Sequence, residues 1–184
     1  IASCLVGSEM CIRDSSCPGW PQNCFFTRVE HMSVTDRTVL LAGATSPSGL
    51  ALARALVDAG ARVIATGRSA ERLQSLRSIG AQVEVADATS LEAMTELASR
   101  LDTVDAVIPL VGGWRGGGGL AGQSDDDFRA LLPALDAVRA TSRAFDGALR
   151  ASDAGRFAIV SSTAVGRPLA VSYTHLTLPT NREV

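Results

Sequence analysis

Short apolar runs alternate with longer segments of helical periodicity along most of the chain. The apolar runs hold five to eight residues, a length typical of strands that are buried on both faces of a parallel sheet. Serine, threonine or glycine residues mark many of the places where one segment gives way to the next. The pattern predicts strands at 38–42, 61–66, 81–86, 104–111 and 156–161, and helices at 48–59, 69–79, 89–100 and 124–150 with their caps included.

This alternation of strands and helices indicates a parallel sheet with helices packed on both of its faces. Right-handed crossovers favour the strand order 3-2-1-4-5. We therefore expect an α/β fold, a doubly wound parallel sheet in a three-layer α/β/α arrangement of the Rossmann-like type. The pattern stops after the fifth strand, so we expect the fold to be incomplete.

Four positions within these elements carry specific local predictions. Thr89 and Glu92 fit a capping box, in which the threonine caps the helix and the glutamate returns a hydrogen bond to it. Pro133 predicts a kink or a fresh start in the last helix, because an interior proline costs about 3 kcal/mol. Pro109 is awkward in a central strand, since proline cannot donate to the ladder.

The two ends of the chain lack this periodicity. Residues 1–31 carry all four cysteines, with no Cys-x-x-Cys pair and no paired histidines nearby, which argues against zinc and leaves a small disulfide knot as one interpretation. Both ends resemble translated sequencing-adapter read-through. We therefore expect 1–31 and 171–184 to be non-native or disordered, and 32–170 to be the folded domain, truncated on its C-terminal side. The cysteines are Cys4, Cys11, Cys17 and Cys24.

The composition is that of a globular protein and excludes several classes of partner. The 184 residues are 46% hydrophobic and 20% charged, with a formal net charge of -2. This mild acidity offers no attraction to nucleic acid or to an anionic membrane, and no apolar run is long enough to span a bilayer. The body of the chain looks like a cytoplasmic enzyme, a class in which disulfides are rare. We expect no metal site.

The most informative motif is the turn between the first predicted strand and the first predicted helix, which reads GATSPSG at 43–49. Phosphate binding needs bare backbone N–H groups and the positive end of a helix, and glycine lets a diphosphate approach. A tight turn without a ligand is the alternative, but the strand-to-helix context favours binding. A Walker A loop is excluded because the chain has no lysine. The candidate cofactor-binding residues here are Gly43, Thr45, Ser46, Pro47, Ser48, Gly49 and Leu50.

This turn, together with the order of the elements, resembles the cofactor loop of the short-chain dehydrogenase/reductase family, with Pro47 where the family has its middle glycine. The resemblance extends from residue 39 to about residue 170. It implies an NAD(P)-dependent oxidoreductase that reduces a small-molecule carbonyl or oxidises an alcohol by hydride transfer. It also implies that the whole protein forms a homo-oligomer.

Two positions that follow the next strands bear on the cofactor. The second strand ends in Thr66-Gly67-Arg68, without the acidic residue that NAD-binding folds use for the ribose hydroxyls. Arg68 suits a 2′-phosphate instead, which favours NADP over NAD; a solvated surface arginine is the alternative. Asp87, with Ala88 beside it, matches the family position that contacts adenine, and an ordinary helix cap is the alternative.

The fourth strand leads into PLVG at 109–112, in the place of the family's Asn-Asn-Ala-Gly, so that only the glycine is kept. The resemblance implies that Val111, Gly112 and Gly113 line the nicotinamide ribose through their backbone. The stretch 112–122 is rich in glycine and is predicted to be a mobile loop.

In this family a serine polarises the carbonyl, a tyrosine donates the proton, and a lysine four residues later lowers the tyrosine pKa. The resemblance assigns Ser162, at the exit of the fifth strand, as the catalytic serine, with Ser161 as the fallback. The family spacing places the tyrosine and the lysine at positions that hold His175 and Pro179 in this chain. Tyr173 lies two residues early with no lysine after it, so it is assigned no role.

Three functions stay open at this point. The first is an NADP-dependent oxidoreductase, of which this chain is a part that binds NADP(H) weakly and does not turn over. The second is a non-catalytic dinucleotide-binding or redox-sensing module, favoured by Pro109, Leu110 and Ala134 where the family has asparagines. The third is an extended-type relative that acts on nucleotide sugars as an epimerase or reductase, because Gly43 and Gly49 also fit that group's looser loop.

Overall fold

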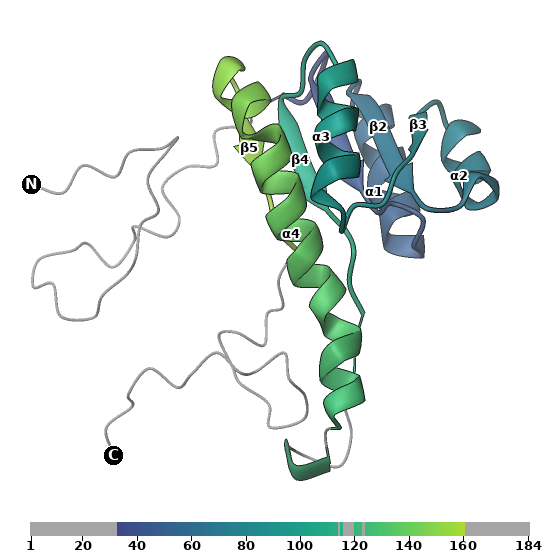
Figure 1. Ribbon diagram of the computed structural model, residues 1–184. Coiled ribbons are helices and arrows are strands. Elements are labelled where there is room, and N and C mark those ends of the chain that lie inside the picture. The colour runs from purple at the N-terminus through teal and green to yellow at the C-terminus, as the bar shows by residue number, and fades with distance from the viewer. Residues whose placement is uncertain (1–32, 114, 116–119, 123, 161–184) are drawn as a thin grey trace, which may run out of the picture.

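The computed structural model describes residues 33–113, 115, 120–122 and 124–160. These residues form a parallel sheet in the order β3-β2-β1-β4-β5 with helices on both faces, which confirms the predicted fold class and strand order (Figure 1). The strands are β1 (Thr38–Ala42), β2 (Arg62–Gly67), β3 (Gln82–Val85), β4 (Ala106–Pro109) and β5 (Arg156–Phe157). The helices are α1 (Pro47–Asp58), α2 (Ala70–Arg77), α3 (Leu91–Arg100) and α4 (Asp125–Ala151), with a 3₁₀ turn, η1 (Leu120–Gly122), before α4.

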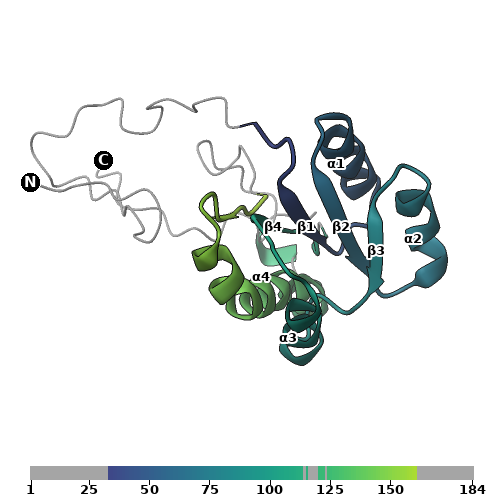
Figure 2. The same ribbon diagram turned by 90° about the horizontal axis from the view of Figure 1, so that it is seen from above.

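Two apolar layers, one on each face of the sheet, hold the helices in place. Successive residues of a strand point to opposite faces, so Val39 and Leu41 of β1 pack on the side of α1 and α2, whereas Leu40 packs on the side of α3 and α4. Seen from above, the two pairs of helices lie on opposite sides of the sheet (Figure 2). Within the described part of the chain, no helix is both long enough and apolar enough to cross a membrane.

The start of α3 differs from the predicted capping box. The N-cap is Ser90, whose hydroxyl accepts from the N–H of Ala93, and the prediction that Thr89 caps this helix is therefore wrong. Thr89 is engaged elsewhere, because its N–H and hydroxyl donate to a carboxylate oxygen of Asp87 at 2.9 and 2.8 Å. Thr89 and Ser90 could each cap this helix. Because Thr89 is hydrogen-bonded to Asp87, Ser90 serves as the N-cap.

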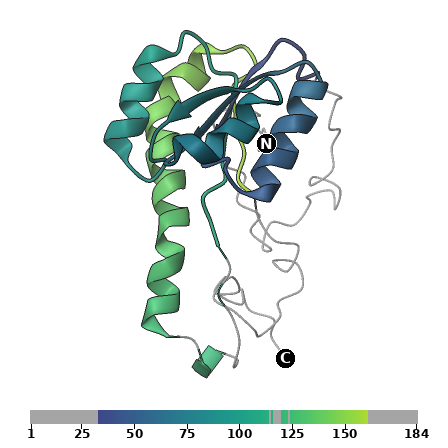
Figure 3. The same ribbon diagram turned by 90° about the vertical axis from the view of Figure 1, so that its right-hand side faces the viewer.

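Helix α4 runs without interruption through Pro133, so the predicted fresh start at that residue is wrong. Its N-cap is Ser124, as predicted, and Ser124 forms a capping box with Asp127. Its C-terminal half is anchored in the core by Ala137, Ala140 and Phe145, while its N-terminal half projects past the carboxyl ends of the strands (Figures 1 and 3). Because that anchored half secures the helix, one missing backbone donor costs stability without ending it.

Strands β4 and β5 are shorter than the predicted 104–111 and 156–161, and Pro109 explains why the pairing of the two strands stops where it does. The N–H of Leu110 donates to Ala42 of β1 at 2.7 Å, so N–H groups at even positions of β4 face β1 and those at odd positions face β5. On the β5 side, Ala158 donates to the carbonyl of Val107 at 3.0 Å. The next bond would need an N–H at position 109, which proline lacks, so pairing with β5 stops there.

At the amino-terminal ends of the strands, Asp105 links the starts of β1 and β4 to the end of α4. Its carboxylate accepts from the N–H of Thr38 at 2.8 Å and from the hydroxyl of Ser152 at 2.6 Å. The Ser152 hydrogen bond lowers the pKa of Asp105 below its ordinary value; the Thr38 amide and the charge of Arg37 act in the same direction, and partial burial opposes them. The side chain of Asp105 is only 14% exposed, so these bonds are largely shielded from water.

Gly49 sets how closely α1 approaches the end of β1. It lies buried in the first turn of α1, and a Cβ atom built on it would stand 2.7 Å from the carbonyl carbon and 2.8 Å from the Cα of Ala44. These neighbours are backbone atoms, which cannot rotate away as a flexible side chain would. Only glycine therefore permits this contact between the helix start and the turn.

Replacing Gly49 with alanine is expected to lower the free energy of unfolding by about 1–3 kcal/mol, because the added methyl group overpacks a rigid contact. Urea unfolding followed by far-UV circular dichroism measures the change. Gly147→Ala is the matched control, since a Cβ at this helical position of α4 meets nothing within 4 Å; it should raise stability by up to about 1 kcal/mol. Equal effects of the two substitutions would contradict the packing role of Gly49.

Asp105→Asn is expected to lower the free energy of unfolding by about 2 kcal/mol at neutral pH, since two hydrogen bonds to a charged acceptor are weakened. The folded pKa of Asp105 lies below its unfolded value of about 3.9, so its contribution is present above about pH 4 and is lost as the pH falls through the folded pKa. Unfolding curves at pH 7 and at lower pH should show the gap between variant and parent closing in acid. Asp102→Asn, in the neighbouring exposed loop, should change little at either pH.

Candidate functional site

A pocket of about 270 Å³ opens where the carboxyl ends of β1, β2 and β4 meet the residues that follow β3. Ligands of open α/β sheets bind at this end of the strands. The pocket brings together eight of the predicted cofactor residues: Gly43, Thr45, Ser46, Arg68, Asp87, Ala88, Val111 and Gly112. It is also lined by six residues that the sequence analysis did not select: Gly67, Arg72, Ala86, Thr89, Leu110 and Pro133.

The remaining predicted residues lie beside the pocket or outside the described residues. Four of them form the first turn of α1 next to the pocket without lining it: Pro47, Ser48, Gly49 and Leu50. Gly113 is exposed and does not line it. Ser162 and its fallback Ser161 fall outside the described residues, as do Trp114, Tyr173, His175, Pro179 and the four cysteines.

Hydrogen bonds hold the turn after β1 against the end of β2. Gly43 adopts a φ of +85°, in the left-handed region that favours glycine, and its N–H donates to the carbonyl and the hydroxyl of Thr66, both at 3.1 Å. The N–H of Ala44 donates to the same carbonyl at 2.8 Å. These two amides are therefore used within the fold and are not available to a ligand.

The amides that come next are free to bind an anion. Within the described residues, the N–H groups of Thr45, Ser46 and Ser48 donate to no acceptor, and Pro47 between them has no N–H to leave unpaired. The hydroxyl of Ser46 caps α1 by accepting from Gly49 at 3.1 Å. Three N–H groups that no described acceptor uses thus lie at the start of a twelve-residue helix, where the positive end of the helix dipole favours phosphate.

Close packing shapes the floor of the pocket. A Cβ atom on Gly43 would stand 2.6 Å from Cγ2 of Val111, and one on Gly67 would stand 2.6 Å from Cγ2 of Thr45. The ends of β1, β2 and β4 are therefore in contact through their glycines. Side chains at either position would fill the space beneath the turn and displace it.

Two arginines form the wall that faces solvent. Arg68 follows β2 and is exposed, and Arg72 lies in the first turn of α2 with Nη2 donating to the carbonyl of Thr45 at 3.0 Å. The sequence analysis selected Arg68 but missed Arg72. A signal was present, because a cation in the first turn of a helix is electrostatically unfavourable unless an anion or an acceptor compensates it.

Asp87 is held in one orientation at the β3 side of the pocket. The hydrogen bond from the N–H of Thr89 lowers the pKa of the Asp87 carboxyl below its ordinary value; the Thr89 hydroxyl and the charge of Arg68 add to this effect, and partial burial opposes it. Both bonds go to the Oδ1 atom. The carboxylate is therefore ionised at neutral pH, and no donor among the described residues uses Oδ2, which can accept a hydrogen bond from a ligand.

The fourth side of the pocket is apolar. Leu110 and Val111 line it from the end of β4, and Pro133 closes it from α4. No titratable side chain of the described residues stands at this end of the pocket. No group of three His, Cys, Asp or Glu side chains that could hold a metal occurs in the described part of the chain either.

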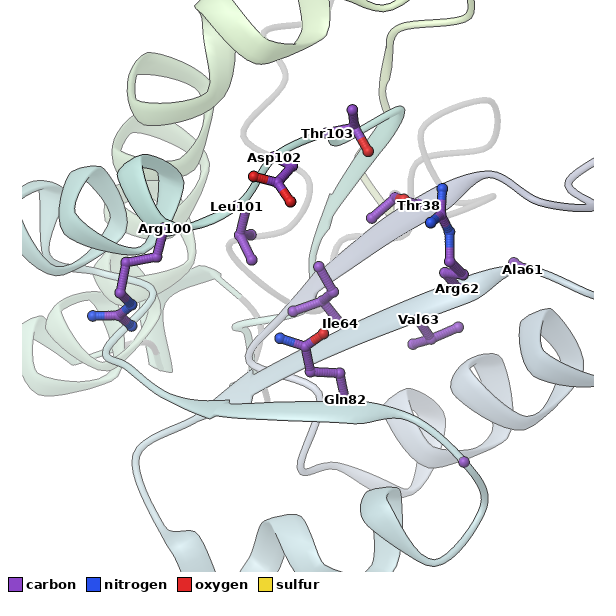
Figure 4. A pocket seen from close by; sticks show the side chains of 11 residues that line it. Thr38, Ala61, Arg62, Val63, Ile64, Gln82, Arg100, Leu101, Asp102 and Thr103 are labelled. Atoms are coloured by element: carbon purple, nitrogen blue, oxygen red, sulfur yellow. The ribbon is translucent and has the colours of Figure 1, made fainter.

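A larger pocket of about 430 Å³ lies at the opposite, amino-terminal ends of β1 and β2 and the start of β3 (Figure 4). Its floor is Ile64 and its rim carries Gln82 and Arg100. Arg100 already pairs with Glu96 at 2.7 Å and with Glu84 at 3.5 Å. This larger pocket lies at the end of the sheet away from the carboxyl ends of the strands, where ligands of such sheets usually bind. We therefore place the candidate site in the smaller pocket.

Comparisons with known proteins bear on the family and the fold of the chain. The profile of the family described as short chain dehydrogenase matches residues 37–174. A solved Escherichia coli protein described as a short chain dehydrogenase is 24% identical with a TM-score of 0.68, over 75% of this chain and 67% of that one. A Shigella flexneri protein of the same description, complexed with NADP, is 22% identical with a TM-score of 0.69, over 78% of this chain and 66% of that one.

A third solved structure, serine dehydrogenase from Escherichia coli, is 26% identical with a TM-score of 0.66, over 72% of this chain and 65% of that one. The chain thus spans about two thirds of the length of these structures. No curated protein matches the sequence significantly. Because the family profile matches well over half of the chain, the protein belongs to the short-chain dehydrogenase family.

Proposed function

We propose that the chain binds NADP, in preference to NAD, in the pocket at the carboxyl ends of the strands, as part of an oxidoreductase that interconverts a small-molecule carbonyl and an alcohol. The observation that carries this proposal is the set of three bare amides at the start of α1, at Thr45, Ser46 and Ser48. Their donors and the helix dipole suit the diphosphate of a dinucleotide. The proposed domain extends over 32–170, and the proposed location is the cytoplasm.

The preference for NADP rests on the end of β2. Gly67 and Arg68 stand where NAD-binding folds place a carboxylate that accepts from the ribose hydroxyls. A guanidinium there offers paired donors and a positive charge to a 2′-phosphate. The NADP complex of the Shigella flexneri structure is in line with this choice.

Asp87 is proposed to orient the adenine. Its Oδ1 atom is occupied by Thr89, and the free Oδ2 atom of the ionised carboxylate suits the amino group of adenine, which is a hydrogen-bond donor. Ala86 and Ala88, both buried, flank this position with small side chains that leave room for the flat ring. These contacts are common to NAD and NADP.

At the nicotinamide end, we propose separate roles for the cofactor and for the protein. The cofactor supplies or accepts the hydride when bound, and the protein positions it. Val111, Gly112 and Gly113 offer backbone groups for the nicotinamide ribose, and Ser162 polarises the substrate carbonyl. Since the positions of the family's tyrosine and lysine hold His175 and Pro179, this polypeptide is proposed to bind the cofactor weakly without turnover.

A second candidate is a non-catalytic dinucleotide-binding module. It is favoured by the apolar fourth side of the pocket, where Leu110, Val111 and Pro133 offer no polar side chain to a reacting carbonyl. The two candidates share the same diphosphate site. They differ in whether a proton donor stands beside the substrate carbonyl.

Arg68→Ala is expected to weaken NADP⁺ binding by about tenfold and NAD⁺ binding by less than about twofold, because only NADP⁺ carries the 2′-phosphate. Isothermal titration calorimetry of the full chain measures both dissociation constants. Arg77→Ala, an exposed arginine at the other end of α2, is the matched control and should change neither. Equal losses for the two cofactors on removing Arg68 would speak against a 2′-phosphate site.

The full chain is expected to show no carbonyl reduction with NADPH when absorbance at 340 nm is followed over a panel of aldehydes and ketones. The physical reason is that His175 and Pro179 replace the tyrosine and the lysine that the family uses to donate the proton. A form of the protein that continues with Tyr-x-x-x-Lys should turn over. Steady reductase activity from the present chain would refute the proposed inactivity.

A further inference from the structure

Four side chains from three neighbouring strands form the sheet side of the larger pocket, at the amino-terminal ends of the strands (Figure 4). The parallel register pairs Thr38 of β1 with Arg62 of β2, and Ile64 of β2 with Gln82 of β3. Paired residues share a face of the sheet, and alternation along β2 puts Arg62 on the same face as Ile64. That face is the one covered by α3 and α4. The segment that follows α3 supplies the opposite wall through three residues: Leu101, Asp102 and Thr103.

The hydroxyl of Thr38 is a buried polar group without a partner. Thr38 is only 5% exposed, and its backbone N–H and carbonyl are both bonded to Asp105. Its hydroxyl, by contrast, makes no hydrogen bond within the described part of the chain. Burying a hydroxyl without a hydrogen bond costs free energy, so such groups usually meet a ligand or an ordered water. Since Thr38 lines the pocket, a molecule in the pocket is the partner that its position allows.

Two side chains of opposite charge line this pocket without an ion pair. The guanidinium of Arg62 has no carboxylate oxygen within 4.0 Å among the described residues; it donates to the carbonyl of Asp36 at 3.4 Å and acts on Asp105 only at longer range. The carboxylate of Asp102 makes neither a hydrogen bond nor an ion pair in the same part of the chain. Asp102 follows the C-terminus of α3, where the negative end of the helix dipole adds to its charge. Arg100, also at the rim, is already held in two ion pairs.

This combination of groups suits a small zwitterion that carries an apolar side chain. A guanidinium binds a carboxylate through paired N–H donors, and the hydroxyl of its register neighbour Thr38 can donate to the same carboxylate. A carboxylate and the C-terminus of a helix both favour an ammonium group. Ile64 and Leu101 add apolar surface to the same pocket. Its volume of about 430 Å³ lies within the range of about 300–1,000 Å³ that is usual for small-molecule sites.

We propose that the larger pocket is a second binding site, for a free α-amino acid with an aliphatic side chain. Arg62 and Thr38 hold the carboxylate of this ligand. Asp102 and the end of α3 hold its ammonium group, and its side chain packs on Ile64 and Leu101. The site is separate from the proposed cofactor site, because no residue lines both pockets.

A ¹⁵N–¹H correlation spectrum of the full chain titrated with L-leucine tests the site. The amides of Thr38, Ile64 and Leu101 should shift together, whereas those of Thr45 and Ser46 in the turn after β1 should not move. Two further probes each lack one charged group: 4-methylpentanoate has no ammonium group, and 3-methylbutylamine has no carboxylate. Each of them should bind at least about tenfold more weakly than L-leucine, because one charge-assisted contact is lost.

Charge-removing variants assign each charged group of the ligand to its residue. Arg62→Gln should weaken L-leucine binding by about tenfold without weakening 3-methylbutylamine, which has no carboxylate to lose. Asp102→Asn should weaken L-leucine by about fivefold without weakening 4-methylpentanoate, since the end of α3 still favours the ammonium group. Arg77→Gln and Asp58→Asn, exposed residues outside the pocket, are the matched controls and should change neither affinity.

Thr38→Val keeps the shape of the side chain and removes its hydroxyl. It should weaken L-leucine binding by about threefold or more, while urea unfolding shows a stability no lower than that of the parent, since the folded chain loses no described hydrogen bond. The proposal is overturned if L-leucine shifts none of the pocket amides, or if the acid and the amine bind as tightly as L-leucine. Variants of Arg62 and Asp102 that behave like their controls would overturn it as well. All of these results leave the proposed cofactor site untouched.

Discussion

The contact between the first turn of α1 and the end of β1 is the constraint on which the site depends. Gly49 lets the helix start sit directly on the backbone of Ala44. The turn itself is fixed from the other side, where Gly43 and Ala44 donate to Thr66 of β2. Because the amides of Gly43 and Ala44 bond to Thr66, the amides left without described partners at the positive end of α1 are those of Thr45, Ser46 and Ser48. The arrangement that packs α1 against the sheet thus also leaves the amides on which the proposed cofactor site depends.

Polar groups around Asp105, at the amino ends of the strands, and those at the carboxyl ends differ in whether they have partners within the fold. Around Asp105, polar groups pair with one another: the Asp105 carboxylate accepts from the backbone N–H of Thr38 and from the hydroxyl of Ser152. At the carboxyl ends, donors and charges are left over: bare amides after β1, two arginines after β2, and half of the carboxylate of Asp87. Polar groups without a partner in the fold can bind a ligand or water, and their concentration at the carboxyl ends of the strands supports the proposed cofactor site.

The sequence predicted the elements well where the information is local. A strand such as β1, buried along its whole length, is a continuous apolar run and could be identified without a structure. Predictions failed where distant residues decide. Whether Thr89 or Ser90 caps α3 depends on Asp87, and the length of β5 depends on Pro109 of the neighbouring strand.

The site was predictable in part for the same reason. The glycine-rich turn and the exposed Arg68 can be recognised from their order along the chain, but the use of the Gly43 amide by Thr66 appears only once the two strands are paired. Arg72 was missed because its partner, Thr45, is 27 residues away. Eight of the predicted cofactor residues line one pocket, while Ser162 lies outside the described residues.

The most direct test of the account is a ¹⁵N–¹H correlation spectrum of the chain titrated with NADP⁺. The account predicts that the amide resonances of Thr45, Ser46 and Ser48 shift on binding, since these groups would meet the diphosphate. The amides of Gly43 and Ala44, already bonded to Thr66, should move much less. Shifts confined to other parts of the chain, or a spectrum that saturating NADP⁺ leaves unchanged, would contradict the claim that this turn is the cofactor site.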